Sequence, residues 1–317
     1  MERSEAMRDG AGIAARGLLI VLAAPSVAAL AFEPGAPSAA ALRVLAEIAT
    51  IPAFYAVAGW LMAAPIASAR PLDFVRVVAP MAVCATIAAL CAGLTAPLAG
   101  LDWQAGVLQA TPIWSLALLP AVYALVVRIA PASLGALFAL ALAGHVAGVI
   151  LGKPALAHFI FFVAGIALAS RREELFRLAR EEPEFSIASG PFVVVLATAI
   201  AIRFAATGQP ATVAAVGPIS LVMGLAIGPT ALASAAALCK GPAGEALVRL
   251  GRASPAFVMF WVPLFATMIR AANRGASTST ASALLMAIAS LLIIAVIADI
   301  AIDARERAAF PSATARR

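Results

Sequence analysis

The chain has 317 residues, of which 63% are hydrophobic and 12% are charged. A soluble domain is nearer half apolar and one quarter charged, so this composition excludes a water-soluble globular protein. Because a membrane helix needs about 20 apolar residues, the chain can supply about ten spans. The apolar runs are continuous rather than alternating, which excludes a membrane β-barrel.

Ten apolar stretches, separated by segments with proline, glycine and charge, predict an all-α polytopic membrane protein. They lie at about 13–32, 45–64, 75–97, 112–129, 133–151, 155–171, 189–207, 212–239, 254–272 and 281–303. We expect one integral-membrane domain over 1–317, with a cytoplasmic tail at about 1–12, a cytoplasmic loop at 172–188 and a second tail at 304–317.

The net charge of +6 bears on orientation, because basic residues are retained preferentially on the cytoplasmic side. With ten spans and the N-terminus inside, 17 of the 22 basic residues fall on the cytoplasmic side and 5 on the other. One span more or fewer would place the later basic loops on the wrong side. The pattern predicts that both termini are cytoplasmic. Residues 17–32 also resemble a signal-peptide core, but the charge distribution favours their retention as the first span.

Cys84, Cys91 and Cys239 lie in or beside apolar stretches. No pair of them has the spacing of metal ligands, and an odd number argues against a disulfide framework. We interpret them as small packing residues and expect no metal site.

Ionisable groups within apolar stretches are costly to bury, so they mark functional or paired sites. Those in this chain are Glu47, Arg76, His145, His158, Arg203 and Asp299. Arg43 and Glu47 are four residues apart on one helix face, which predicts a structural pair. Asp299 lies close enough to the end of the last stretch to be solvated there.

His145 and His158 are the two imidazoles of the chain, and imidazole is the usual general acid or base near neutral pH. They are therefore the candidate catalytic residues. A membrane histidine also commonly hydrogen-bonds a neighbouring helix, and this structural interpretation stays open for both.

Six segments in chain order carry a family resemblance. They are 15–22 (ARGLLIVL), 51–61 (IPAFYAVAGWL), 74–80 (FVRVVAP), 112–116 (PIWSL), 161–168 (FFVAGIAL) and 250–261 (LGRASPAFVMFW). In order and spacing they resemble the bacterial membrane acyltransferase family often called acyltransferase-three. Members of that family O-acylate surface glycans, periplasmic glucans and antibiotics.

The resemblance implies a ten-span protein that uses acyl-CoA as the donor substrate. By position in the family motifs, Arg16, Arg76 and Trp114 would bind the anionic acyl donor near the cytoplasmic face. Arg252 and Ser254 match the family's Gly-Arg-x-Ser motif and would have a structural role.

Three family positions are changed in this chain. The first-span histidine falls at Val27, or at Pro25 in a shifted alignment, and neither side chain accepts a proton. The second-span serine becomes Ala58, and the C-terminal histidine becomes Trp261. Two explanations stay open: His145 or His158 supplies a relocated base, or the chain no longer catalyses transfer.

We therefore expect an O-acyltransferase of the bacterial inner membrane, which moves an acyl group from cytoplasmic acyl-CoA to a glycan or lipid-linked acceptor on the outer face. One alternative is a ten-helix small-molecule transporter or exporter, because Gly217-Pro218 and Gly228-Pro229 would suit a broken helix. The other is a non-catalytic, acyltransferase-like protein. We expect no bound cofactor and no nucleic-acid partner. The abundant alanine and glycine would allow a homo-oligomer in the lipid bilayer.

Overall fold

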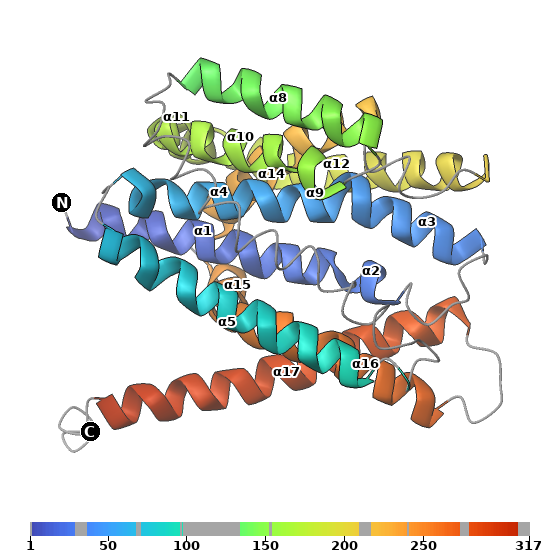
Figure 1. Ribbon diagram of the computed structural model, residues 1–317. Coiled ribbons are helices and arrows are strands. Elements are labelled where there is room, and N and C mark those ends of the chain that lie inside the picture. Colours follow the sequence, from blue (N-terminus) through green and yellow to red (C-terminus); the bar gives the residue numbers. More distant parts are fainter. Residues whose placement is uncertain are drawn as a thin grey trace.

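The computed structural model describes residues 2–28, 37–67, 71–95, 97, 134–151, 154–208, 217–239, 241–272 and 279–309. All regular secondary structure in these ranges is helical (Figure 1). In chain order the elements are α1 (Glu2–Leu22), α2 (Ala24–Ala28), α3 (Pro37–Leu45), the π-helical turn η2 (Ala46–Thr50), α4 (Ile51–Ala67), α5 (Pro71–Thr95), α8 (Leu134–Leu151), α9 (Pro154–Ala157), α10 (Phe159–Ser170), α11 (Arg172–Glu181), α12 (Pro183–Ala205), α14 (Pro218–Leu238), α15 (Pro242–Arg252), α16 (Ser254–Ala272) and α17 (Thr280–Ala309).

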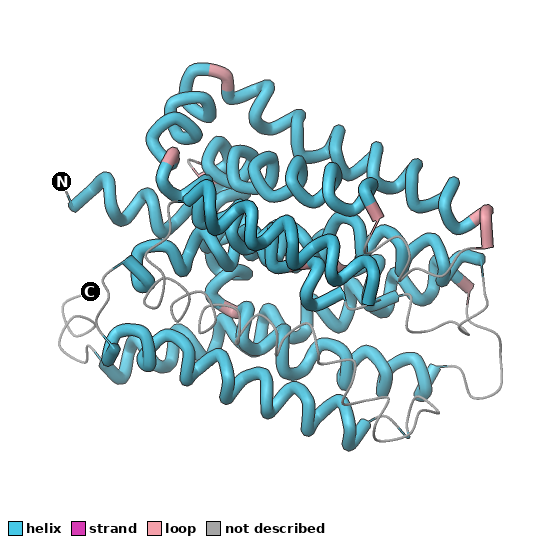
Figure 2. The backbone as a smooth tube through the Cα atoms, turned by 45° about the horizontal axis from the view of Figure 1, so that its top comes forward, coloured by secondary structure: helices cyan, strands magenta, loops and turns pink. Residues whose placement is uncertain are grey.

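The long helices lie side by side in one array, as the tube in Figure 2 also shows. Helix α1 begins and helix α17 ends at the same end of this array, on the left in Figure 1. Helix α11 lies at that end too, and we call it the α11 end. Helix α8 lies at the edge of the array and packs mainly against α9 and α10.

Five helices in the described ranges are long and apolar enough to cross a membrane. Their apolar segments are Ala40–Ala63, Leu134–Leu151, Pro183–Ala205, Pro218–Leu238 and Ala281–Ala304. Three shorter apolar helical segments are Gly10–Leu22, Ala82–Cys91 and Phe159–Ser170. These lengths and compositions support an integral membrane protein. The predicted stretch at 112–129 lies outside the described residues, and the count of ten spans stays a prediction.

Glycines bring α4 and α10 into direct backbone contact. A Cβ atom on Gly59 would collide with the carbonyl oxygen of Phe162, and one on Gly165 would collide with the carbonyl oxygen of Ala56. The contact is reciprocal, because each glycine faces the backbone three residues before the other. Small residues allow such close approach between membrane helices, where dispersion and not the hydrophobic effect holds them together. Gly17 and Gly251 make the same kind of contact between α1 and α15.

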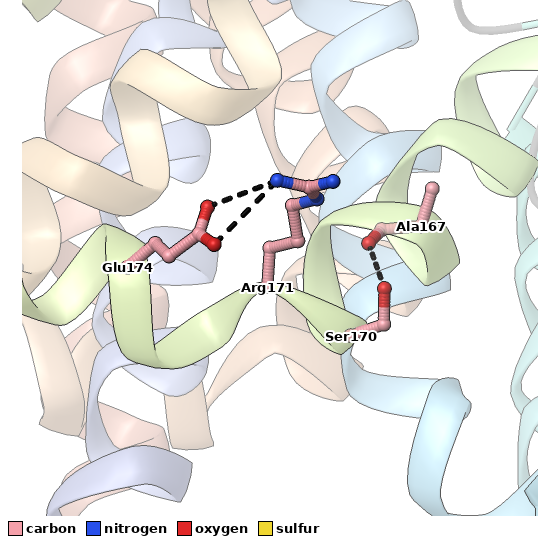
Figure 3. A network of polar contacts seen from close by, with 4 residues as sticks. All are labelled: Ala167, Ser170, Arg171 and Glu174. Carbon is pink, nitrogen blue, oxygen red and sulfur yellow. Dashed lines mark hydrogen bonds and ion pairs between the residues drawn. The ribbon is translucent and has the colours of Figure 1, made fainter.

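The charged segment expected as a loop at 172–188 is helical. After α10, Ser170 donates a hydrogen bond to the Ala167 carbonyl oxygen at 2.6 Å, and Arg171 pairs with Glu174 at 3.3 Å (Figure 3). Helix α11 follows with Glu173 and Glu174 in its first turn, where acidic groups favour the helix dipole. The chain turns at Glu182 and continues as α12. The expected tails are also partly helical, since α1 begins at Glu2 and α17 ends at Ala309.

The segment that would suit a broken helix in a transporter is continuous. Helix α14 begins at Pro218 and runs through Pro229 to Leu238 without interruption. The irregular turn lies instead in the second predicted span, where η2 interrupts the α-helical geometry between α3 and α4. π-Helical turns are rare and occur frequently at functional sites.

Candidate functional site

The two histidines meet at the α8–α10 contact. His145 belongs to α8, and His158 occupies the turn between α9 and α10. Both rings contact Phe161, with ring centroids 6.4 Å apart for His145 and 6.0 Å apart for His158. Only 4% of His145 and 3% of His158 is exposed. Two imidazoles that are 13 positions apart in sequence therefore share one buried aromatic environment.

His145 has a defined partner. Its Nδ1 lies 2.9 Å from the carbonyl oxygen of Ala157. Because a carbonyl only accepts, this geometry requires the proton on Nδ1. The bond joins α8 to the end of α9, so His145 has a clear role in fastening the edge helix.

His158 has a polar atom without a partner. Its Nε2 is buried and makes no hydrogen bond among the described residues. The ring lies 5.2 Å from the ring of Tyr55 on α4, measured between centroids. The surrounding side chains are apolar and fully buried, with Ile160 and Phe162 beside the aromatic rings. A neutral imidazole with a free nitrogen is a base, and leaving such an atom unpaired is costly for stability.

Arg16, which is expected to bind an acyl donor, is partly buried on α1. Its neighbours Ala15 and Leu19 belong to a different core cluster from Phe161, the residue that both histidines contact. Arg76 lies on α5, which packs mainly against α16. Trp114 lies outside the described residues.

The two family histidine positions lie in one apolar cluster. Val27 on α2 and Trp261 on α16 are both buried there, with Phe257 and Phe265 nearby in the same cluster. The indole N–H of Trp261 donates to Ser290 Oγ at 3.0 Å and to the Ala287 carbonyl oxygen at 3.2 Å, which ties α16 to α17. Packing residues therefore occupy Val27 and Trp261, two positions that the resemblance aligns with histidine. Pro25, the position in the shifted alignment, is partly buried on α2.

The remaining predicted residues belong to α3, η2, α15 and α16. The Oε2 atom of Glu47 is buried without a partner among the described residues, and the predicted pairing of Glu47 with Arg43 stays a prediction. Arg252 is exposed at the end of α15, and Ser254 is the first residue of α16.

Asp299 is partly buried, with 38% of its side chain exposed, and it is paired. Arg249 on α15 contacts it at 3.2 Å and so links α15 to α17. The two residues are 50 positions apart, so no local pattern in the sequence indicates this pair.

Sequence reasoning also missed a surface hollow of about 570 Å³ at the end of the array opposite α11. It is lined by the last turns of α12 and the start of α14, at Ala199, Ile200, Arg203, Phe204, Ala206, Thr207 and Ile219. Arg203 and Thr207 are the polar side chains among the lining residues. Among the described residues, no group of three or more His, Cys, Asp or Glu side chains is placed to hold a metal ion.

Compared with known proteins, the chain matches no family model, no curated protein and no solved structure.

Proposed function

We propose that this chain is an inner-membrane protein of the acyltransferase type. It takes an acyl group from acyl-CoA on the cytoplasmic side and passes it to a hydroxyl group of a glycan or similar acceptor on the outer side. The six ordered segments of the sequence support this proposal. So does the placement of the α1 start, the α17 end and the arginine-rich α11 at one end of the array, as a ten-span protein with both ends inside requires.

The observation that carries the proposal is the free nitrogen of His158. In this proposal His158 Nε2 accepts the proton of the acceptor hydroxyl while the hydroxyl oxygen bonds to the acyl carbon; the thioester C–S bond breaks, and the imidazolium gives the proton to the departing CoA thiolate. His145 holds α8 in place through Ala157. Because α8 packs mainly on α9 and α10, displacement of this edge helix opens the histidine pair to a substrate. Arg16, Arg76 and Trp114 bind the donor, and the acyl thioester must then reach His158.

The test uses purified protein in proteoliposomes supplied with radiolabelled acetyl-CoA. We expect thioester turnover that His158→Gln abolishes and that Arg203→Gln, a change in the distant hollow, leaves intact. The His145→Gln variant keeps turnover but reduces it, since its role is to hold α8. Absence of turnover in the native protein, or full turnover in His158→Gln, would exclude this mechanism.

A second function is favoured by the apolar cluster around Val27 and Trp261. With both family positions filled by packing residues, the scaffold would bind an acyl donor without transferring its acyl group. This form predicts acyl-CoA binding that weakens in Arg16→Ala and persists in His158→Gln, with no product in either. Binding of a fluorescent acyl-CoA, measured beside the turnover assay, distinguishes the two functions.

A further inference from the structure

Glu47 is an acidic group in the π-helical turn η2, within an apolar segment long enough to cross the membrane. Its side chain is partly buried, and its Oε2 atom is fully buried without a hydrogen-bond partner in the described ranges. A carboxylate in such surroundings is very costly unless it is paired or neutralised. Acyl transfer at His158 makes no use of this group, because His158 lies in the turn between α9 and α10 and contacts Tyr55 and Phe161.

The register of α14 against α4 predicts that Ser220 on α14 lies toward the same turn. The helices run in register, because a Cβ atom on Gly224 would lie 2.6 Å from Pro52 Cβ and one on Gly228 would lie 2.6 Å from Ala56 Cβ. One turn earlier on both helices, Ser220 faces η2, and η2 and α14 are in contact. Ser220 is 0% exposed, and its Oγ atom is also buried without a hydrogen-bond partner. Two unpartnered polar side chains thus come from facing helical turns.

No fixed cation compensates Glu47 in the described structure. Helix α14 contains no charged residue, and α4 contributes Tyr55 as its titratable group. Helix α3 carries Arg43 one turn before Glu47, and the Oε2 atom of Glu47 has no hydrogen-bond partner among the described residues. Helix α12 carries Arg203, which is exposed and lines the hollow. Without a paired cation, Glu47 avoids the cost of a buried charge by keeping its carboxyl group protonated.

The hollow brings water close to this site. Its lining includes Ile219, the neighbour of Ser220 in sequence. Ile200 and Phe204 also line it, and both pack against the core cluster that contains Ile48, the neighbour of Glu47. The exposed guanidinium of Arg203 and the hydroxyl of Thr207 make the hollow wettable. The rim of the hollow therefore adjoins Ser220 in the chain and is the candidate entry for protons, at the end of the array opposite α11.

We propose that Glu47 and Ser220 form a proton-binding site inside the helix array, which exchanges protons with the Arg203 hollow. The site goes beyond the proposed acyl transfer and does not depend on it. Glu47 holds the proton as a carboxylic acid, Ser220 is the hydrogen-bonding partner of that acid, and the π-helical turn places the carboxyl at the interface with α14.

A lipid-soluble carbodiimide tests the proposal, because it reacts with protonated carboxyl groups in apolar surroundings. The carboxyl oxygen bonds to the central carbon of the carbodiimide, and the carboxyl proton moves to its nitrogen. We expect tandem mass spectrometry of the labelled full-length protein to find the adduct on Glu47. Labelling should fall by about tenfold per pH unit once the carboxyl ionises. Glu47→Gln removes the adduct, whereas the matched exposed variant Glu174→Gln does not.

Two further labelling experiments test the role of Ser220 and the identity of the bound cation. Ser220→Ala should move the pH at which labelling is half-maximal, and an unmoved midpoint would remove Ser220 from the site. Sodium chloride should protect Glu47 no better than choline chloride. Selective protection by sodium would overturn the proton site in favour of a metal-cation site.

Infrared spectroscopy covers the case in which the carbodiimide does not reach Glu47. The native protein should show the carbonyl stretch of a protonated carboxyl group, and Glu47→Gln should lose it while melting at the same temperature. The same spectrum for both proteins would overturn the proposal. All of these readouts are independent of acetyl-CoA turnover, so failure of the acyl-transfer proposal leaves them interpretable.

Discussion

Trp261 donates its indole N–H to the hydroxyl oxygen of Ser290 at 3.0 Å, and Ser290 in turn donates to the Ala287 carbonyl oxygen at 2.9 Å. This buried chain of hydrogen bonds fixes α16 against α17. Trp261→Phe keeps most of the aromatic volume and removes the donor, so we expect a loss of about 1 kcal/mol in the free energy of unfolding. Ser290→Ala should cost less, because the indole N–H still reaches Ala287. Thermal melting in detergent measures both, and equal melting of Trp261→Phe and native protein would contradict the role.

The reciprocal contact of Gly59 and Gly165 should be intolerant of a methyl group. Alanine at either position would force α4 and α10 apart, at a cost of about 1–3 kcal/mol or more in the free energy of unfolding. Gly144 on α8 is the matched control, because its Cβ would meet the Leu156 carbonyl oxygen at an ordinary 3.8 Å. Gly144→Ala should be neutral or stabilise by up to about 1 kcal/mol through helix propensity. Similar melting temperatures for Gly59→Ala and Gly144→Ala would count against the close approach.

Substitution by phenylalanine should change the free energy of unfolding in opposite directions at the two histidines. His145→Phe loses the bond to the Ala157 carbonyl oxygen, at a cost of about 0.5–1.5 kcal/mol, and leaves that oxygen unpaired. His158→Phe removes an unsatisfied buried nitrogen and should be neutral or stabilising. Under the proposed function the second variant is also inactive, which is a trade-off between stability and activity. Hydrogen exchange should show faster opening of α8 in His145→Phe, and a destabilised His158→Phe would indicate a partner for His158 Nε2.

Cys239 should react slowly with alkylating reagents at neutral pH. It follows α14 directly, and burial raises the pKa of its thiol above the ordinary value. The thiolate is the nucleophile, so a raised pKa leaves less reactive thiolate at neutral pH. The alkylation rate of Cys239 should therefore keep rising with pH above the range in which the alkylation rate of free glutathione reaches its plateau. The measurement uses maleimide in a Cys84→Ala, Cys91→Ala protein. A plateau at or below that of glutathione would contradict the effect of burial.

Hydropathy located the helices well, because their period and length are local properties of the chain. In the described ranges each predicted apolar stretch contains helix, and the predicted 133–151 and 254–272 segments nearly coincide with α8 and α16. Hydropathy did not predict the helices of the charged segments. Helices α11 and α15 are amphipathic and short, and their stability comes from packing on neighbours that are distant in sequence.

The candidate site was only partly predictable. The two histidines could be singled out by their rarity, but not their shared contact with Phe161 or the different environments of their nitrogens. The predicted Arg43–Glu47 pair assumed regular α-helical geometry over these residues. The π-helical turn at Ala46–Thr50 alters that geometry, and no local pattern in the sequence indicates this turn or its contact with α14.

The contact between Gly59 and Gly165 also sets an order of events during synthesis. The two glycines are separated by about a hundred residues, which a ribosome adds in about 5–20 s. Throughout that interval α4 has been made while its partner α10 has not, so the bare backbone groove at Gly59 must be covered by lipid or by the insertion machinery. Slowing translation between these helices should prolong the time during which α4 can be cross-linked to that machinery.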